Sequence, residues 1–221
     1  MNIFAVNEDP RVAAIELPDK LVPKMLVESA QMLSTAHRVL DGDAGADAKG
    51  LYKKAYENHP SCVWVREDAM NYWWLWMHAL TLSEEYKWRF TDETGVAAHK
   101  TVLVIHALQD LPVNIPANKD TSWEVLADLP LCMPDQYKHK QGSGHKIYVM
   151  ESYQQFVTQD KPYMQDVFKA YANAIQKKEN HKDKHFSSGI DYPPRWVSSF
   201  ATAEQRKHMD LHKLMNPETA I

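Results

Sequence analysis

The sequence contains few glycines and few cysteines, and each scarcity excludes a class of site. Seven glycines among 221 residues form no GxGxxG or GxxxxGK, the loops that cradle phosphates in many nucleotide-binding folds. The two cysteines, Cys62 and Cys132, have no CxxC partner, so their spacing indicates neither a disulfide framework nor a thiolate zinc site. We therefore expect a reducing compartment, the cytoplasm.

Long apolar runs are also missing. No segment reaches the roughly 18 uncharged apolar residues that span a bilayer, so we expect no membrane partner. The first residues, MNIFAVNEDPRV, reach an acid and a proline after a short apolar run, unlike a signal peptide. A net charge of −4 argues against a protein that holds DNA mainly by bulk electrostatics, although it is compatible with a local basic patch.

Helical patterns occupy most of the chain. Residues 65–90 contain no proline or glycine and predict the longest helix, at the centre of the fold. Further helices are expected over 11–17, 19–40 and 97–111, after Lys161-Pro162, and around 203–214, with a short strand over 2–6. We predict one all-α domain over 1–221, in which 41–50 form a surface loop and 177–221 a charged C-terminal extension packed on the domain.

The predicted central helix carries a polar stripe on an otherwise apolar surface. Helical spacing places six residues within an arc of about 60°, namely Glu67, Asn71, Trp74, His78, Glu85 and Arg89. The apolar surroundings predict that the middle of this helix is buried. A buried charge must be paired or face a wet cavity. The stripe therefore indicates either a functional cleft or a structural network.

A second polar stripe lies on the helix expected over 19–40. Six residues fall within about 80° of each other, namely Lys20, Lys24, Glu28, Gln31, Thr35 and Arg38. A polar face opposite an apolar one is typical of any surface helix. However, the mixture of lysines, a carboxylate, an amide and an arginine also suits recognition of a phosphate or nucleotide. Both interpretations stay open.

The segment NHPSCVWVRE, residues 58–67, brings His59, Trp64, Arg66 and Glu67 close to the start of the central helix. An aromatic ring with arginine and histidine can stack on a base and hydrogen-bond to it. A core tryptophan beside a salt-bridged entry turn explains the same residues. No Ser-His-Asp or Cys-His constellation is identified, because no nucleophile-elbow motif is present.

A metal site is weakly indicated. His99, His106 and Asp110 fall within about 40° on a helix expected over 97–111, and His106 and Asp110 have the i, i+4 spacing that can share a metal. An HExxH motif is absent, and a lone His-Asp pair is more often a surface hydrogen bond. We expect no metal and leave the cofactor open; if a metal binds, His78, His99, His106 and Asp110 are its ligands.

Four further segments are informative: NIFAVNEDPRVAAIELPDKLVPKMLVESAQMLSTAHRVLDG, NHPSCVWVRE, EEYKWRF and CMPDQYK. Together they resemble a family of small proteins encoded by tailed bacteriophages, and the resemblance extends to about Tyr171. It implies a helical fold and a phage context, hence the host cytoplasm, but no mechanism. Lys24, Glu28, Gln31 and His37 match the family's pattern, whereas Leu21 stands where the family would have histidine.

The phage context favours a nucleotide- or DNA-modifying enzyme with a cleft between helices. In this hypothesis Glu28, Glu67 or His78 transfers protons, while the substrate-binding residues supply cations, amides and stacking rings. The substrate-binding residues are Lys20, Lys24, Gln31, Trp64, Arg66, Asn71 and Trp74. The alternative is a non-catalytic helical module that binds a host protein or nucleic acid, in which the same polar residues form a buried structural network.

Overall fold

The computed structural model describes residues 1–91, 99–119, 125–139, 146–180 and 190–215, and within these ranges it contains helices and no strand. The α-helices are α1 (Pro10–Ile15), α2 (Leu21–Leu40), α3 (Asp43–Ala48), α4 (Pro60–Glu67), α5 (Ala69–Phe90), α6 (Val102–Ala107), α7 (Lys146–Asp160), α8 (Val167–Ala170), α9 (Ala172–Asn180), α10 (Arg195–Phe200) and α11 (Ala203–Met215). Two 3-10 helices, η1 (Asp135–Tyr137) and η2 (Pro162–Gln165), complete the described elements. The predicted all-α class is confirmed.

The N-terminal segment is buried but forms no strand, so the prediction of a strand over 2–6 was wrong. Residues Ile3 to Val6 are almost fully buried, and no described strand lies beside them to complete a ladder. Their backbone groups are satisfied in other ways; for example, the Gln154 side-chain amide donates to the Val6 carbonyl at 2.7 Å. The apolar run therefore serves as core without regular structure.

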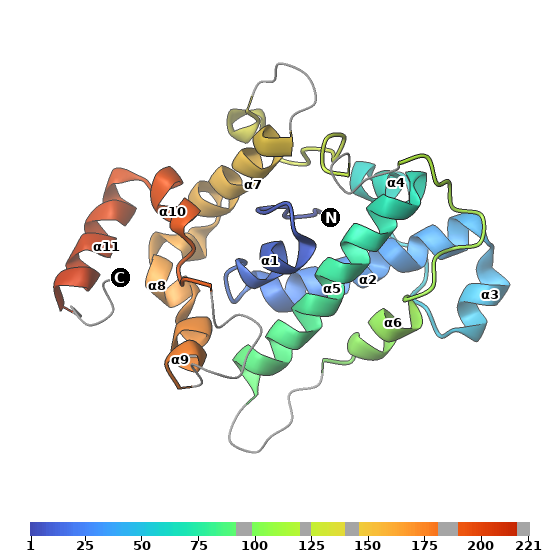
Figure 1. The fold of residues 1–221 in the computed structure, drawn as a ribbon, viewed down its shortest axis with the longest axis horizontal. Coiled ribbons are helices and arrows are strands. Elements are labelled where there is room, and N and C mark those ends of the chain that lie inside the picture. Colours follow the sequence, from blue (N-terminus) through green and yellow to red (C-terminus); the bar gives the residue numbers. More distant parts are fainter. Residues whose placement is uncertain (92–98, 120–124, 140–145, 181–189, 216–221) are drawn as a thin grey trace.

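Helices α2 and α5 form the centre of the fold and run antiparallel. His37 near the end of α2 lies 3.0 Å from the hydroxyl of Tyr72 near the start of α5, and Asp19 just before α2 lies 3.3 Å from Arg89 near the end of α5. Helix α1 packs against α5 beside this pair (Figure 1). Both long helices have apolar faces at helical spacing, and these faces supply much of the main core.

The predicted helix over 65–90 is divided at Asp68. This residue is extended, with φ −155° and ψ 143°, and separates α4 from α5. Its carboxylate accepts the Met70 N–H at 2.8 Å through one oxygen and the backbone N–H groups of Asn118 and Lys119 through the other. An aspartate at this position caps α5. The helical periodicity of residues 65–90 could not predict the bonds from residues 118 and 119, because these residues belong to a distant segment.

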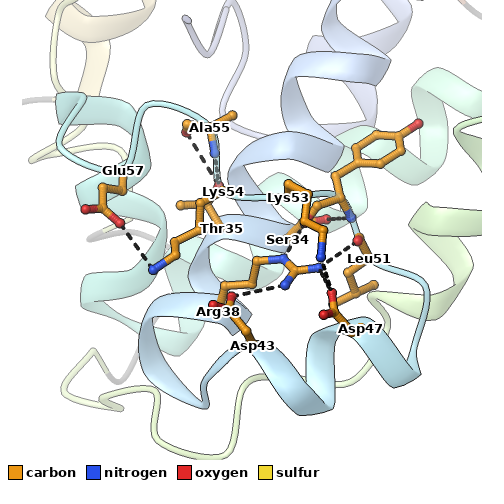
Figure 2. A network of polar contacts seen from close by, with 11 residues as sticks. Ser34, Thr35, Arg38, Asp43, Asp47, Leu51, Lys53, Lys54, Ala55 and Glu57 are labelled. Carbon is orange, nitrogen blue, oxygen red and sulfur yellow. Dashed lines mark hydrogen bonds and ion pairs between the residues drawn. The ribbon is translucent and has the colours of Figure 1, made fainter.

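The tract 41–50, expected as a loop, contains the short helix α3, and most of its residues are exposed. Buried Arg38 anchors it from α2. Its guanidinium donates to Asp43 at 3.0 Å and to Asp47 at 2.6 Å, as well as to the carbonyls of Leu51 and Tyr52. Figure 2 shows the guanidinium directed between the two aspartates. Arg38 thus holds α3 against the end of α2.

The helices from α7 onward form the other side of the molecule (Figure 1). A second, smaller core gathers Met164, Val167, Ala170, Tyr171, Val197, Ala201 and Met209, so residues 197–209 pack against residues 164–171. The Tyr171 hydroxyl donates to the Glu16 carbonyl at 3.0 Å, and the Asn173 N–H donates to Asp19 at 2.8 Å. These bonds join the second core to the turn between α1 and α2. Among the described residues, none of the helices combines the length and the apolar character that a membrane span requires.

Candidate functional site

The polar stripe of α5 faces the protein interior, and its charged end is a structural network. Arg89 is buried; it donates to Glu85 at 2.8 Å and to the carbonyls of Ile15 and Leu17 at 2.5 and 2.6 Å. Ile15 is the last residue of α1, and Leu17 lies two residues beyond it. Carbonyls at the end of a helix have no N–H partner within the helix, and the arginine supplies that partner here. Asp19, at 3.3 Å, is a second carboxylate for the same guanidinium. Glu85 and Arg89 therefore connect α5 to α1 and α2.

Asn71 and Trp64, both predicted to bind substrate, are buried and bonded to the protein. The Asn71 amide donates to the Trp64 carbonyl at 2.8 Å and accepts from the Lys119 ammonium at 2.8 Å. The Trp64 indole donates to Asp128 at 3.0 Å, and Asp128 also accepts from Lys119. Asn71 and Trp64 fasten the chain around residues 119 and 128 to α4 and α5, so these two predictions are corrected.

His78 and Trp74 are likewise enclosed. Both side chains are at most 1% exposed and stack on each other with ring centroids 5.4 Å apart, while the Trp74 indole donates to the Glu8 carbonyl at 2.9 Å. Burial lowers the pKa of His78 to about 3, and neither ring nitrogen has a hydrogen-bond partner among the described residues. A neutral, enclosed imidazole cannot exchange protons with an external substrate, so the catalytic role predicted for His78 is not supported.

Glu67 does not converge with His78. It is exposed at the last position of α4, whereas His78 lies in the buried middle of α5. The break at Asp68 removes Glu67 from the helix on which the stripe was projected. These two candidates for proton transfer therefore do not share a site.

The predicted metal ligands are also dispersed. Helix α6 ends at Ala107, so Asp110 lies beyond it and the helical spacing from His106 does not apply. His99 uses its Nδ1 to accept the Thr101 N–H at 3.3 Å. Across the described ranges, no three His, Cys, Asp or Glu residues are arranged to hold a metal ion.

Three predicted residues of α2 remain at the surface: Lys24, Glu28 and Gln31. Glu28 is partly buried, with 20% of its side chain exposed; one oxygen lies 3.8 Å from the Lys24 ammonium. The other oxygen accepts the backbone N–H of Asn2 at 3.1 Å. This bond fixes the carboxylate beside the lysine.

His59 joins this group from the start of α4. Its Nδ1 accepts the Ser61 N–H at 3.2 Å and so caps the helix, which leaves Nε2 to carry the proton of the neutral ring. Burial is the main cause that lowers the pKa of His59, and the charge of Glu28 acts in the opposite direction. His59 therefore presents a neutral N–H donor near Glu28 at pH 7.

Tyr56 is the residue that sequence reasoning missed. Its side chain is 75% exposed and its backbone is left-handed, with φ 50°, a conformation that costs a tyrosine energy and often marks a functional position. Its carbonyl accepts the His59 N–H at 2.8 Å. The only signal in the sequence is an aromatic residue within the polar, non-periodic stretch YKKAYENH.

The turn that contains Tyr56 is held in place on both sides. Thr35 of α2 accepts the Ala55 N–H at 3.1 Å, and Arg66 of α4 donates to the Glu57 carbonyl at 2.5 Å. Figure 2 shows residues 51–57 lying across α2, with Thr35 and Ala55 in contact. Arg66, predicted to bind substrate, instead supports this turn.

We call the group formed by Lys24, Glu28, Gln31, Tyr56 and His59 the α2–α4 corner. Lys20 lies one helical turn before Lys24 at its edge, with its ammonium 5.6 Å from the centre of the Tyr163 ring. Comparisons of the chain with family models, curated proteins and solved structures give no match. The phage-family resemblance stays a prediction, and the chemistry of the corner is inferred from its own residues.

Proposed function

We propose that the protein is a nucleotide- or DNA-modifying enzyme whose substrate binds at the α2–α4 corner. The observation that carries this proposal is the Glu28 carboxylate, which lies 3.8 Å from the Lys24 ammonium and acts electrostatically on His59, with the exposed Tyr56 three residues before His59 in the chain. These groups provide a cation, a carboxylate, an N–H donor and an aromatic face. The buried stripe of α5 supports the fold around this corner and does not contact the substrate.

Each side chain has a role that follows from its chemistry. The Tyr56 ring stacks on a base, an interaction worth roughly 1–3 kcal/mol per base. Lys24 lies against a phosphate, and the Nε2–H of His59 donates to a phosphate oxygen or to a developing oxyanion. Gln31, one turn beyond Glu28, offers both a donor and an acceptor to a base edge.

Glu28 is the proposed general base. The Asn2 N–H holds one of its oxygens at 3.1 Å, so the second oxygen is oriented while the carboxylate stays partly open to solvent. A carboxylate in this position can accept a proton from a hydroxyl, an amine or water, and Lys24 can stabilise negative charge on the substrate. The corner thus supports acid-base chemistry at a nucleotide.

Binding tests the proposal directly. Isothermal titration of the protein with nucleoside mono-, di- and triphosphates and with short single-stranded oligodeoxynucleotides should reveal at least one ligand. Tyr56→Ala and Lys24→Ala should each weaken its binding by about 5- to 100-fold. Tyr56→Phe, which keeps the stacking face, and Lys87→Ala, an exposed lysine of α5, are the matched controls and should bind as the unmodified chain does.

Two results would contradict the proposal. One is the absence of binding to every nucleotide and oligonucleotide in the series. The other is binding that Tyr56→Ala and Lys24→Ala leave unchanged. Once a substrate is found, Glu28→Gln should bind it with similar affinity and convert it more slowly, because the amide cannot accept the proton.

A further inference from the structure

A second surface differs from the polar α2–α4 corner because it exposes large apolar side chains. Of the six that the described part of the chain exposes, five belong to it: Val39, Trp73, Leu103, Leu111 and Val113. We call these five residues the α6 surface. Leu103 is 79% exposed and Val113 89% exposed, so neither contributes much to the core.

Hydrogen bonds bring the segment that carries Leu111 and Val113 alongside the helix that carries Trp73, and Leu103 lies just before this segment in α6. The chain after α6 runs back along the first half of α5, because the carbonyls of Ile105, Leu108 and Pro116 accept from Trp76, Tyr72 and Ala69 in turn. Trp73 lies on the same face of α5 as Ala69 and Trp76. It therefore lies beside the segment that carries Leu111 and Val113.

The end of α2 completes the surface. The Asp41 carboxylate accepts the N–H groups of Val113 and Asn114 at 2.8 and 3.0 Å, and the Asn114 amide donates to the Leu40 carbonyl. These bonds bring Val113 to the end of the helix on which Val39 is exposed. Figure 1 shows the segment after α6 passing outside α5 toward α3 and the end of α2.

Asp41 and Asp110 are the carboxylates of this surface. Among the described residues, neither forms an ion pair with a lysine or an arginine, and only His37 lies within ion-pair distance of Asp41. Burial raises the pKa of Asp41, but hydrogen bonds from the N–H groups of 114 and 113 outweigh it and lower the pKa overall, so this group stays ionised. His37, 3.8 Å away, is buried, and burial together with Lys49 lowers its pKa, so it does not neutralise the aspartate at pH 7.

We propose that the α6 surface docks a cationic amphipathic segment of a partner protein. The apolar side chains of such a segment cover Leu103, Leu111, Val113 and Trp73, and its lysines or arginines pair with Asp41 and Asp110. Exposed apolar side chains that gather in one region of a surface mark protein-binding sites. A symmetric contact with a second copy fits less well, because a twofold axis through this surface brings the unpaired carboxylates of both copies together.

Synthetic peptides that carry the proposed chemistry of the partner test this inference. The probe is an amphipathic helix of leucine and lysine; the comparisons are a scrambled peptide of the same composition and a leucine-glutamate helix. Fluorescence anisotropy should show the leucine-lysine helix binding at least about tenfold more tightly than either comparison peptide. Its affinity should fall as salt is added, because ion pairs contribute to it.

Variants of the surface assign the binding to these residues. The double variant Leu103→Ser with Val113→Ser, at two exposed positions, and the single variant Asp110→Asn should each weaken the leucine-lysine helix by about tenfold or more. Tyr56→Ala removes an exposed aromatic ring elsewhere and should leave this binding unchanged. Equal binding by the scrambled peptide or by the double variant would overturn the proposal. So would a concentration-dependent dimer in sedimentation that the double variant abolishes, since the occupant is then a second copy.

Discussion

The buried guanidinium of Arg89 donates to the buried carboxylate of Glu85 at 2.8 Å, one helical turn away on α5. The other nitrogens of the guanidinium donate to the carbonyls of Ile15 and Leu17 and to the carboxylate of Asp19. Because the protein encloses this pair completely, a substrate cannot contact it. The polar stripe of α5, the most conspicuous in the sequence, therefore has a structural role.

Removal of one partner of this pair should be strongly destabilising. Arg89→Met leaves Glu85 and Asp19 buried without their cation, so we expect a loss of about 3–5 kcal/mol in the free energy of unfolding. Urea denaturation followed by circular dichroism measures the loss. Lys87→Met, at an exposed position two residues away, should change it by less than about 0.5 kcal/mol. Similar stabilities of the two variants would contradict a structural role for the stripe.

His78 should make the fold sensitive to acid. Its folded-state pKa of about 3 lies below the ordinary value, so below about pH 6.5 the unfolded chain binds a proton that the folded chain does not. Stability therefore falls as the pH falls, by about 2 kcal/mol between pH 7.5 and pH 5 from this group alone.

The variant His78→Phe keeps an aromatic ring against Trp74 and removes two unpaired polar atoms. It should match or exceed the unmodified chain in stability at pH 7.5, and its advantage should grow by about 2 kcal/mol at pH 5. Unfolding curves at both pH values measure the difference. An advantage that is the same at both would show that His78 is not the group responsible.

Substitution of Tyr56 should weaken nucleotide binding without lowering the stability of the fold. Asparagine tolerates left-handed backbone better than tyrosine, so Tyr56→Asn should leave the fold equally stable or more stable by about 0.5–1 kcal/mol. The same change removes the stacking ring and should weaken nucleotide binding. Parallel thermal unfolding and titration of one sample give both values. A clear loss of stability would indicate that the ring supports the fold.

Arg38 should control the local stability of α3. Arg38→Met removes the donors that reach Asp43, Asp47 and two carbonyls, so the backbone amides of 43–48 should exchange with solvent much faster. Amides in the middle of α5 should exchange at nearly unchanged rates, because opening of a short exposed helix does not require global unfolding. Hydrogen exchange read by mass spectrometry distinguishes these segments. Equal acceleration in α3 and α5 would contradict local anchoring.

The long helices could be predicted from sequence because their apolar residues recur at helical spacing, as in α2 and α5. The division at Asp68 could not, since the N–H groups that fix this residue come from Asn118 and Lys119. The length of α6 was overestimated for a related reason. Beyond Leu108 the chain bonds to Asp41 and to α5 instead of continuing its own helix.

The candidate site was predictable only in part. Lys24, Glu28 and Gln31 share one face of a helix, which spacing reveals. Tyr56 and His59 come from a later segment, which the bond between Ala55 and Thr35 holds against α2, and helical spacing does not reveal this bond. The burial of the α5 stripe depends on acceptors at Glu8, Ile15 and Leu17, and no periodicity of α5 points to these residues.

The most direct measurement is a titration of the isotope-labelled protein with the nucleotide or oligonucleotide that binds it, followed residue by residue by nuclear magnetic resonance. We expect the amide signals of Glu28, Gln31, Tyr56 and His59 to shift in proportion to occupancy. Those of Asn71, His78 and Arg89 in the buried stripe should stay in place. Shifts centred on the α5 stripe, with the corner unchanged, would contradict the assignment of the site to the α2–α4 corner.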